Sequence, residues 1–308
     1  MDLTLSETQT QILDAVGRIL ERNGGWRRAK DVTDQTAHDD RLYDELQEGG
    51  FTELALADGT GPLDAALVVE RIAEDAAVVA NAASLLVYPM VTRRPAPGPV
   101  AIADAGGGPF RLGAAAKMLL IQDGERALRL EPELSDLAQV DNDRTGWPLT
   151  TLAPSALARA EDLGPGAGAA LRNWRRVGLA LEMAGAMRGA LDTTVQYVKD
   201  RVQFGRPIGS FQAIQHRLAQ LTVQAEGAYW LALEAAWRNA DPIHAAAAAT
   251  HAAANAPAVL RETQQMHGAI GFTRDYPLHL WTLKLPALQR EMGGARAHAR
   301  AVAKGLAA

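Results

Sequence analysis

The C-terminal half of the chain is dominated by long helical stretches that are interrupted by glycine and proline. The predicted helices cover Ala169–Val202, Phe211–Asn239, a segment that follows Pro242, and roughly Leu278–Lys304. Glycine-rich breaks at 205–209 and 268–271 end the first and third of them. Four long helices joined by short turns bury their apolar faces most simply by packing as an antiparallel bundle. The sequence therefore predicts a C-terminal helical bundle over residues 165–308.

Residues 1–92 are also expected to be helical. Ser6 is a suitable N-cap for a first helix, in which apolar side chains recur every three to four residues. A second helix is predicted through Asp40–Leu46, ending at Gly49–Gly50, and a third over Leu63–Ala76. This segment is interpreted as an N-terminal helical domain.

Residues 93–164 have a different character, with closely spaced prolines at the start and a glycine run soon after. Turn signals separate short apolar runs, a pattern typical of strands. The runs are Val100–Ala103, Met118–Ile121, Ala127–Leu130 and Leu149–Leu152. We expect a small antiparallel sheet, so the predicted fold class is mostly α with a short β domain between two helical domains.

Composition excludes several classes of function. The chain has no cysteine, so redox chemistry requires a cofactor, thiolate ligation of a metal is excluded, and no metal site is expected. Its net charge of −5 and lack of a basic run argue against nucleic acid as a partner. No charge-free apolar stretch long enough for a membrane span occurs, and the polar, acidic start differs from a signal peptide. A cytoplasmic location is expected.

The break between the first two long C-terminal helices carries the most chemical information. Residues 201–216 read RVQFGRPIGSFQAIQH. Arg201 ends one helix, and Ser210 is a plausible N-cap of the next. A planar guanidinium at such a turn suits a diphosphate, while Phe204 offers an apolar face and Gln212 an amide that both donates and accepts hydrogen bonds. The alternative from spacing alone is an ordinary helix–turn–helix elbow with a solvated arginine.

Residues 201–216 resemble the R-x-x-F-G-x-x-(I/L)-x-x-x-Q elbow of the acyl-CoA dehydrogenase superfamily. Residues 265–277, QMHGAIGFTRDYP, are similar to that family's Q-x-x-G-G-x-G-F-x-x-(E/D)-Y-P segment. Ala269 stands where the pattern has a second glycine, and its methyl group would crowd a close backbone–phosphate contact. The order and separation of the two segments also agree with the family. The resemblance covers the C-terminal half and is looser before it.

The resemblance implies FAD as the cofactor. In this family the C-terminal bundle of one subunit reaches across an interface to hold the ADP half of its neighbour's FAD. By position, Arg201 would meet the pyrophosphate, with Phe204 and Gln212 near the adenine end. The residues expected to line the same moiety from the second segment are Gln265, Gly268 and Gly271.

The family reaction oxidises an acyl-CoA to its 2-enoyl-CoA and needs a carboxylate base. At one family position for this base the chain has Met292, and a helical step of about 100° predicts that the preceding Glu291 faces the surface. At the other position it has Arg175, which cannot act as a base. Glu182, two turns further along that helix, is the remaining candidate. Its apolar surroundings predict that it is buried with a partner or lies at an interface, either as a base or as a structural ion pair.

The short middle region lacks the family's T-E-P-x-x-G-S-D-like loop and its Trp-containing strand, since Trp147 reads as part of a turn. A larger acyl-CoA dehydrogenase subunit would then supply the flavin-ring pocket and the catalytic glutamate. The chain resembles the small subunits of heterotetrameric (α2β2) actinobacterial enzymes that act on bulky, steroid-derived acyl-CoA substrates. The alternatives are a self-sufficient homo-oligomeric dehydrogenase that uses Glu182 and a non-catalytic scaffold homologue. A DNA-associated flavoprotein of the superfamily is disfavoured by the acidic charge.

Overall fold

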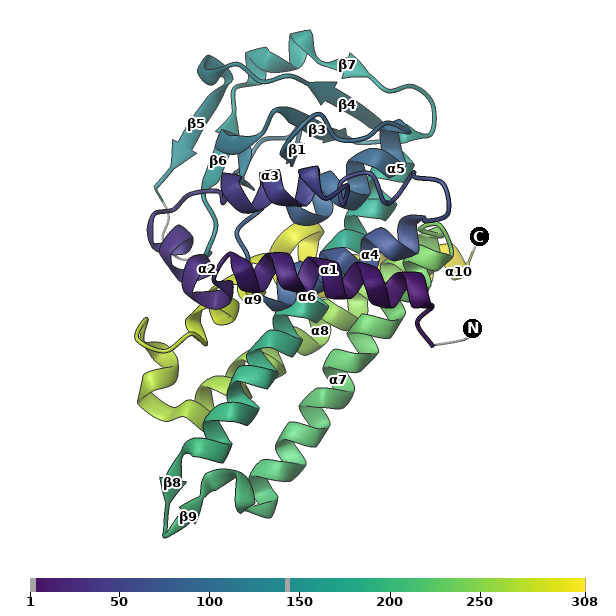
Figure 1. The fold of residues 1–308 in the computed structure, drawn as a ribbon. Coiled ribbons are helices and arrows are strands. Elements are labelled where there is room, and N and C mark those ends of the chain that lie inside the picture. Colours follow the sequence, from purple (N-terminus) through teal and green to yellow (C-terminus); the bar gives the residue numbers. More distant parts are fainter. Residues whose placement is uncertain (1–3, 142–144, 308) are drawn as a thin grey trace.

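The computed structural model describes residues 4–141 and 145–307. Figure 1 shows a β region at one end, a central layer of helices, and a long helical hairpin that projects from the other end. The helices of the N-terminal region lie between residues 7 and 92, the strands of the β region lie between residues 100 and 162, and helices resume at Ala167. The mostly helical class predicted from the sequence is confirmed, and the exact division into three domains stays a prediction.

The N-terminal helices follow the predicted pattern closely. Their bounds are α1 Glu7–Arg22, α2 Gly25–Asp34, α3 Asp40–Glu48, α4 Pro62–Glu74 and, after a π-helical turn at Ala83–Val87, α5 Tyr88–Thr92. The N-cap prediction is confirmed, because the Ser6 hydroxyl accepts the Gln9 N–H at 3.1 Å and the Gln9 side chain accepts the Ser6 N–H at 3.0 Å. Helix α2 was not predicted from the sequence.

The predicted strands exist, but their arrangement differs from one antiparallel sheet. The strands are β1 Val100–Asp104, β2 Phe110–Arg111, β3 Met118–Asp123, β4 Arg126–Leu130, β5 Leu137–Val140, β6 Leu149–Leu152 and β7 Glu161–Asp162. Within the described part of this region they form two sheets, with orders β1-β3-β4-β7 and β2-β6-β5. Strand β1 pairs with β3 in parallel. The expected purely antiparallel pairing is wrong because residues 105–117 form a connection long enough for a parallel crossover.

Helix α6, Ala167–Asp200, is the central element of the C-terminal region and packs against α4, α7, α8 and α9. Helices α7, Gln212–Trp237, and α8, Pro242–His267, correspond to the second and third long helices predicted for this region. Glycine on α6 permits a close approach to α4, since a Cβ on Gly185 would lie 2.3 Å from the Glu70 carbonyl oxygen. The position of α6 is therefore set by backbone contact.

Two local predictions in this region are wrong. The last predicted helix is divided into α9, His279–Arg290, a short 3₁₀ turn, and α10, Gly294–Leu306. Residues 292–294 have φ angles of 53°, 84° and 67°, which an α-helix cannot contain. Ser210 does not cap α7: its hydroxyl donates to the Pro207 carbonyl oxygen at 2.7 Å, and Phe211 precedes the helix.

No helix among the described residues is both long and apolar enough to cross a membrane.

Candidate functional site

The projecting hairpin of α6 and α7 ends in a tight turn. Strands β8, Val202–Gln203, and β9, Arg206–Pro207, pair antiparallel across Phe204 and Gly205. Both turn residues have positive φ, 55° and 78°, as a two-residue hairpin loop requires. A bulky residue adopts this conformation only at an energetic cost, yet the Phe204 ring is 91% exposed. The tip of the hairpin therefore holds an exposed aromatic ring on a residue whose backbone conformation is energetically unfavourable.

Arg201 lies at the base of this turn. Its N–H donates to the Tyr197 carbonyl oxygen, and its own carbonyl oxygen accepts the Ile208 N–H, both at 2.8 Å. The backbone is thus held at both ends, while the exposed guanidinium makes no ion pair within the described parts of the chain. Gln212 is also exposed, at the first position of α7.

The predicted glycine segment follows α8. Gln265 is exposed in the last turn of that helix, and Gly268 has a φ of 64° with open space where a Cβ would lie. Gly271 is buried, and a Cβ there would lie 2.8 Å from the Cβ of His267. The backbone of Gly268 is thus open to a ligand, whereas Gly271 is needed because a side chain there would clash within the loop.

Aromatic stacking joins the elbow to the glycine segment. The rings of Tyr197 and His267 stack at 4.2 Å, and Tyr276 packs against both. The Tyr197 hydroxyl also donates to the His267 carbonyl oxygen at 3.3 Å. Burial lowers the pKa of His267, so the imidazole is neutral, and its Nδ1 lies 2.8 Å from the Thr263 carbonyl oxygen. The two sequence segments therefore meet at one end of the helical region.

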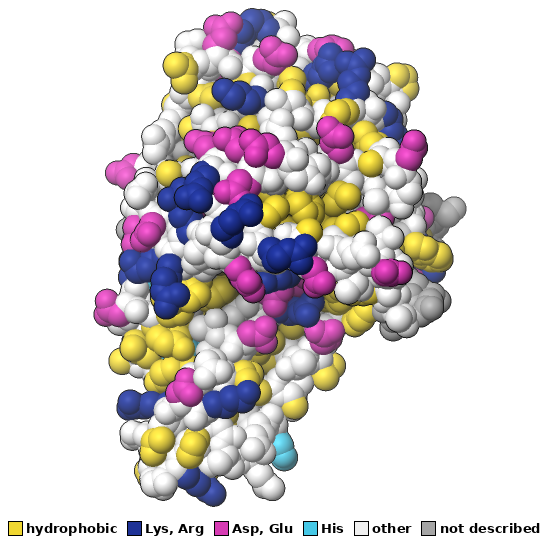
Figure 2. Space-filling model, viewed as in Figure 1, with side chains coloured by type: hydrophobic (Ala, Val, Ile, Leu, Met, Phe, Trp, Pro, Cys, Tyr) yellow, Lys and Arg dark blue, Asp and Glu magenta, His cyan; other side chains and the backbone are white. Residues whose placement is uncertain are grey.

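Apolar side chains are exposed at this same end. Figure 2 shows hydrophobic side chains near the lower part of the molecule, where the hairpin projects. The large ones on the elbow and the glycine segment are Val202, Phe204, Ile270 and Phe272, with exposed fractions of 53%, 91%, 37% and 71%. Exposed apolar residues clustered around polar ones are typical of an interaction surface.

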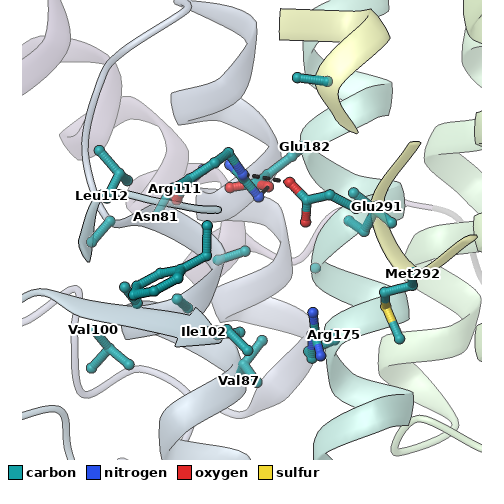
Figure 3. A pocket seen from close by; sticks show the side chains of 18 of the residues that line it. Asn81, Val87, Val100, Ile102, Arg111, Leu112, Arg175, Glu182, Glu291 and Met292 are labelled. Atoms are coloured by element: carbon teal, nitrogen blue, oxygen red, sulfur yellow. Dashed lines mark hydrogen bonds and ion pairs between the residues drawn. The ribbon is translucent and has the colours of Figure 1, made fainter. Parts of the chain in front are cut away.

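A cavity of about 360 Å³ lies away from the elbow, between the β region, α6 and the end of α9. Its apolar wall includes Val87, Val100, Ile102, Leu112 and Leu179. Arg175 and Met292 also line it, as Figure 3 shows. These are the two positions at which the family resemblance places a base, so the chain brings both to one cavity and has a carboxylate at neither.

Arg111 joins two carboxylates at the edge of this cavity. Its Nη2 lies 2.8 Å from Glu182 Oε2 and its Nε 2.6 Å from Glu291 Oε1 (Figure 3). Burial lowers the pKa of Arg111, but the two carboxylates outweigh this and raise it, so the guanidinium is always charged. We refer to Arg111, Glu182 and Glu291 as the Arg111 cluster. In this cluster the carboxylate of the candidate base Glu182 is held in an ion pair with Arg111.

The structure settles two predictions about these carboxylates. Glu182 is buried and ion-paired, one of the two situations expected for it. The prediction that Glu291 faces the surface is wrong, because it lines the cavity and binds Arg111. The helix ends at Arg290, and Glu291 has a ψ of 148°, so the helical step used in the prediction does not apply.

Trp147 and Lys284 extend the Arg111 cluster, and sequence reasoning missed both. Trp147 lies in the expected turn but is buried, with the Arg111 guanidinium 4.4 Å and the Lys284 ammonium 5.0 Å from its ring centre. Lys284 also donates to the carbonyl oxygens of Ala76 and Ala77. Isolated residues without a motif gave no sequence signal for this arrangement.

The pH dependence of stability should reveal Lys284. Burial lowers its pKa from 10.5 to about 7, so the folded state binds this proton less tightly than the unfolded state. Its contribution to stability is present above the ordinary lysine pKa and is lost as the pH falls toward 7. We expect Lys284→Met to increase the free energy of unfolding more at about pH 6 than at about pH 9, by up to about 1.4 kcal/mol per pH unit within that window. Urea unfolding of both proteins at the two pH values measures this, and an equal difference at both would contradict it.

Comparison with known proteins agrees with this architecture. Residues 168–307 match the family model described as the acyl-CoA dehydrogenase C-terminal domain. Acyl-CoA dehydrogenase IpdE2 of Mycobacterium tuberculosis is 42% identical over 103 residues, which are 33% of this chain and 32% of that protein. Acyl-CoA dehydrogenase FadE34 of the same organism is 41% identical over 122 residues, 38% of this chain and 17% of the relative. The chain thus matches about a third or less of the length of these relatives.

Solved structures resemble the chain over nearly its whole length. The ChsE4-ChsE5 complex from Mycobacterium tuberculosis contains a chain with a TM-score of 0.84 and 23% identity, with 100% and 99% of the two chains covered. The Tcur3481-Tcur3483 steroid ACAD G363A variant gives 0.83 and 25%, covering 99% and 100%. Butyryl-CoA dehydrogenase from Megasphaera elsdenii gives 0.80 and 21%, covering 100% of both chains. The family model thus identifies residues 168–307 as an acyl-CoA dehydrogenase C-terminal domain, and the fold of the chain is shared with these structures over nearly its whole length.

Proposed function

We propose that this chain is a subunit of an FAD-dependent acyl-CoA dehydrogenase and supplies the ADP-binding half of an interfacial flavin site. A larger partner subunit supplies the flavin-ring pocket, the acyl pocket and the catalytic glutamate. The elbow holds the cofactor, and the reaction is the α,β-dehydrogenation of a bulky acyl-CoA. FAD supplies the hydride acceptor for that reaction.

The single observation that carries this proposal is the tip of the α6–α7 hairpin. Phe204 is 91% exposed and has a φ of 55°. Such an unfavourable backbone conformation occurs most often at functional sites, including ligand-binding sites. Beside it, Arg201 offers a guanidinium with no internal ion pair among the described residues. An aromatic face next to an unpaired guanidinium suits an adenine ring and a diphosphate.

The other residues of this end have compatible chemistry. Gln212 and Gln265 are exposed amides, and Gly268 offers open backbone. Gly271 contributes by shaping the loop, since its missing Cβ is needed for packing against His267. In the proposed site Arg201 binds the pyrophosphate, while Phe204 and the two amides orient the adenine end.

The composition of the cavity supports division of the work between two chains. Met292 and Arg175 cannot remove a proton from a substrate, and the carboxylate of Glu182 forms an ion pair with Arg111 at 2.8 Å. A general base must be free to approach the proton it removes. The catalytic glutamate is therefore assigned to the partner, and Glu182 to a structural ion pair.

The heteromeric assembly is proposed by analogy. Two of the structural neighbours are described as complexes of two different chains, ChsE4-ChsE5 and Tcur3481-Tcur3483, and the second is described as a steroid ACAD. The exposed apolar residues around the elbow provide a surface on which such a partner can bind. We accordingly propose a heterotetramer with a steroid-derived or similarly bulky acyl-CoA as substrate.

Expression with and without the partner tests the proposal. The chain produced alone is expected to be colourless, and co-expression with an acyl-CoA dehydrogenase subunit encoded beside it should give a yellow complex that reduces a dye with acyl-CoA. Absorbance of the released flavin, divided by the amount of complex, measures the result. A yellow homo-oligomer that turns over acyl-CoA by itself would instead support a self-sufficient enzyme. A colourless co-purified complex would support a scaffold.

A further inference from the structure

The cavity of this chain combines the family's base positions with an internal ion cluster, and we propose that the Arg111 cluster closes this cavity to a flavin ring. This inference rests on the proposed function, in which the flavin ring lies in the partner's pocket. It adds a specific reason why the flavin ring binds in the partner and not in this chain. Three charged side chains of this chain exclude the ring from the cavity in which the family resemblance places the chemistry.

The cluster spans three separate segments of the cavity wall. Arg111 comes from β2 in the β region, Glu182 from the middle of α6, and Glu291 from the turn after α9. Figure 3 shows the three side chains converging across one end of the cavity. A ligand that entered at this end would have to part these segments.

The cluster is also held from behind. The guanidinium of Arg111 lies 4.4 Å from the centre of the Trp147 ring, and the Lys284 ammonium lies 5.0 Å from the same centre. Arg111 therefore cannot simply swing toward the turn that carries Trp147. This contact with the Trp147 ring helps to hold the guanidinium in place between the two carboxylates.

Charge makes displacement unfavourable. The side chains of Arg111 and Glu182 are 19% and 8% exposed, so separating them would leave a buried carboxylate without its partner. A neutral flavin ring carries no cation that could replace the guanidinium. Charge therefore opposes displacement of the cluster by the ring at this end of the cavity.

Lumiflavin tests this proposal, because it contains the flavin ring but no diphosphate or adenine. Its binding to the full-length chain is followed by the quenching of its fluorescence. The wild-type chain is expected to show no saturable binding. The triple variant Arg111→Ala, Glu182→Gln, Glu291→Gln removes the guanidinium and both charges together, and it should bind lumiflavin saturably once circular dichroism shows that it is folded.

A matched control removes a different ion pair from the same cavity wall. Arg175 pairs with Asp104 at 2.7 Å, and both line the cavity. The double variant Asp104→Asn, Arg175→Met should leave lumiflavin unbound, because the Arg111 cluster remains in place. Saturable binding by this control would show that the cluster is not the barrier.

Two further results would overturn the proposal. Saturable binding of lumiflavin by the wild-type chain would do so whether or not the triple variant folds. A folded triple variant that still fails to bind would also do so. Neither result depends on the elbow, since lumiflavin lacks the groups that Arg201 is proposed to hold. Failure of this inference can thus be distinguished from failure of the proposed FAD-binding role.

Discussion

Replacing Arg201 by alanine in the assembled protein is expected to release most of its flavin. The exposed guanidinium makes no ion pair among the described residues, so its removal should not disturb the fold. Hydrogen bonds to charged groups contribute about 1.5–3 kcal/mol, which corresponds to a dissociation constant about 10- to 100-fold higher. Titration of the flavin-free complex with FAD measures the change.

Two variants make this experiment specific. Arg201→Lys keeps the charge but not the planar pair of donors, so its affinity should lie between those of the wild type and Arg201→Ala. Arg41→Ala removes an arginine side chain that is 67% exposed on α3 and should leave FAD affinity unchanged. Equal affinity of Arg201→Ala and wild type would remove Arg201 from the proposed site.

Gly185→Ala is expected to destabilise the chain strongly. A Cβ at this position on α6 would lie 2.3 Å from the Glu70 carbonyl oxygen and 2.8 Å from the Glu74 nitrogen, both backbone atoms of α4. Since backbone cannot rotate away, α4 and α6 must separate. We expect a loss of about 3 kcal/mol or more in the free energy of unfolding, at the upper end of the range for overpacked cores. Urea unfolding followed by circular dichroism measures it.

Gly17→Ala is the matched control for this substitution. Gly17 lies in α1, and a Cβ there would meet nothing within 4 Å. Alanine is the better helix former, so this variant should be up to about 1 kcal/mol more stable than the wild type. If both variants unfolded at the same urea concentration as the wild type, the close α4–α6 crossing would be incorrect. That crossing matters for function because α6 carries Glu182 and ends immediately before Arg201.

Local patterns in the sequence predicted much of this fold. The period of apolar residues and the glycine breaks located the long helices, and Ser6 with Gln9 forms a capping box whose two members are three residues apart. The elbow was recognised because its chemistry is contained within 16 consecutive residues, RVQFGRPIGSFQAIQH. Predictions of this kind succeed where the interacting groups are neighbours along the chain.

Features that depend on distant residues were not predictable. Arg111 meets Glu182 71 residues away and Glu291 180 residues away, and no periodicity links them. The orientation of Glu291 depends on a break at residues 292–294, of which only two are glycines, so the helical pattern concealed it. No sequence pattern marks Lys284 as buried, and only the fold shows it packed against Trp147.

The proposed function depends on the guanidinium of Arg201 holding a diphosphate at the tip of the α6–α7 hairpin. An experimental structure of the purified complex with its flavin measures this directly. We predict that Arg201 lies within hydrogen-bonding distance of the FAD pyrophosphate, about 3 Å between heavy atoms, with the ring system in the partner's pocket. An elbow that faces bulk solvent, far from any nucleotide, would contradict it.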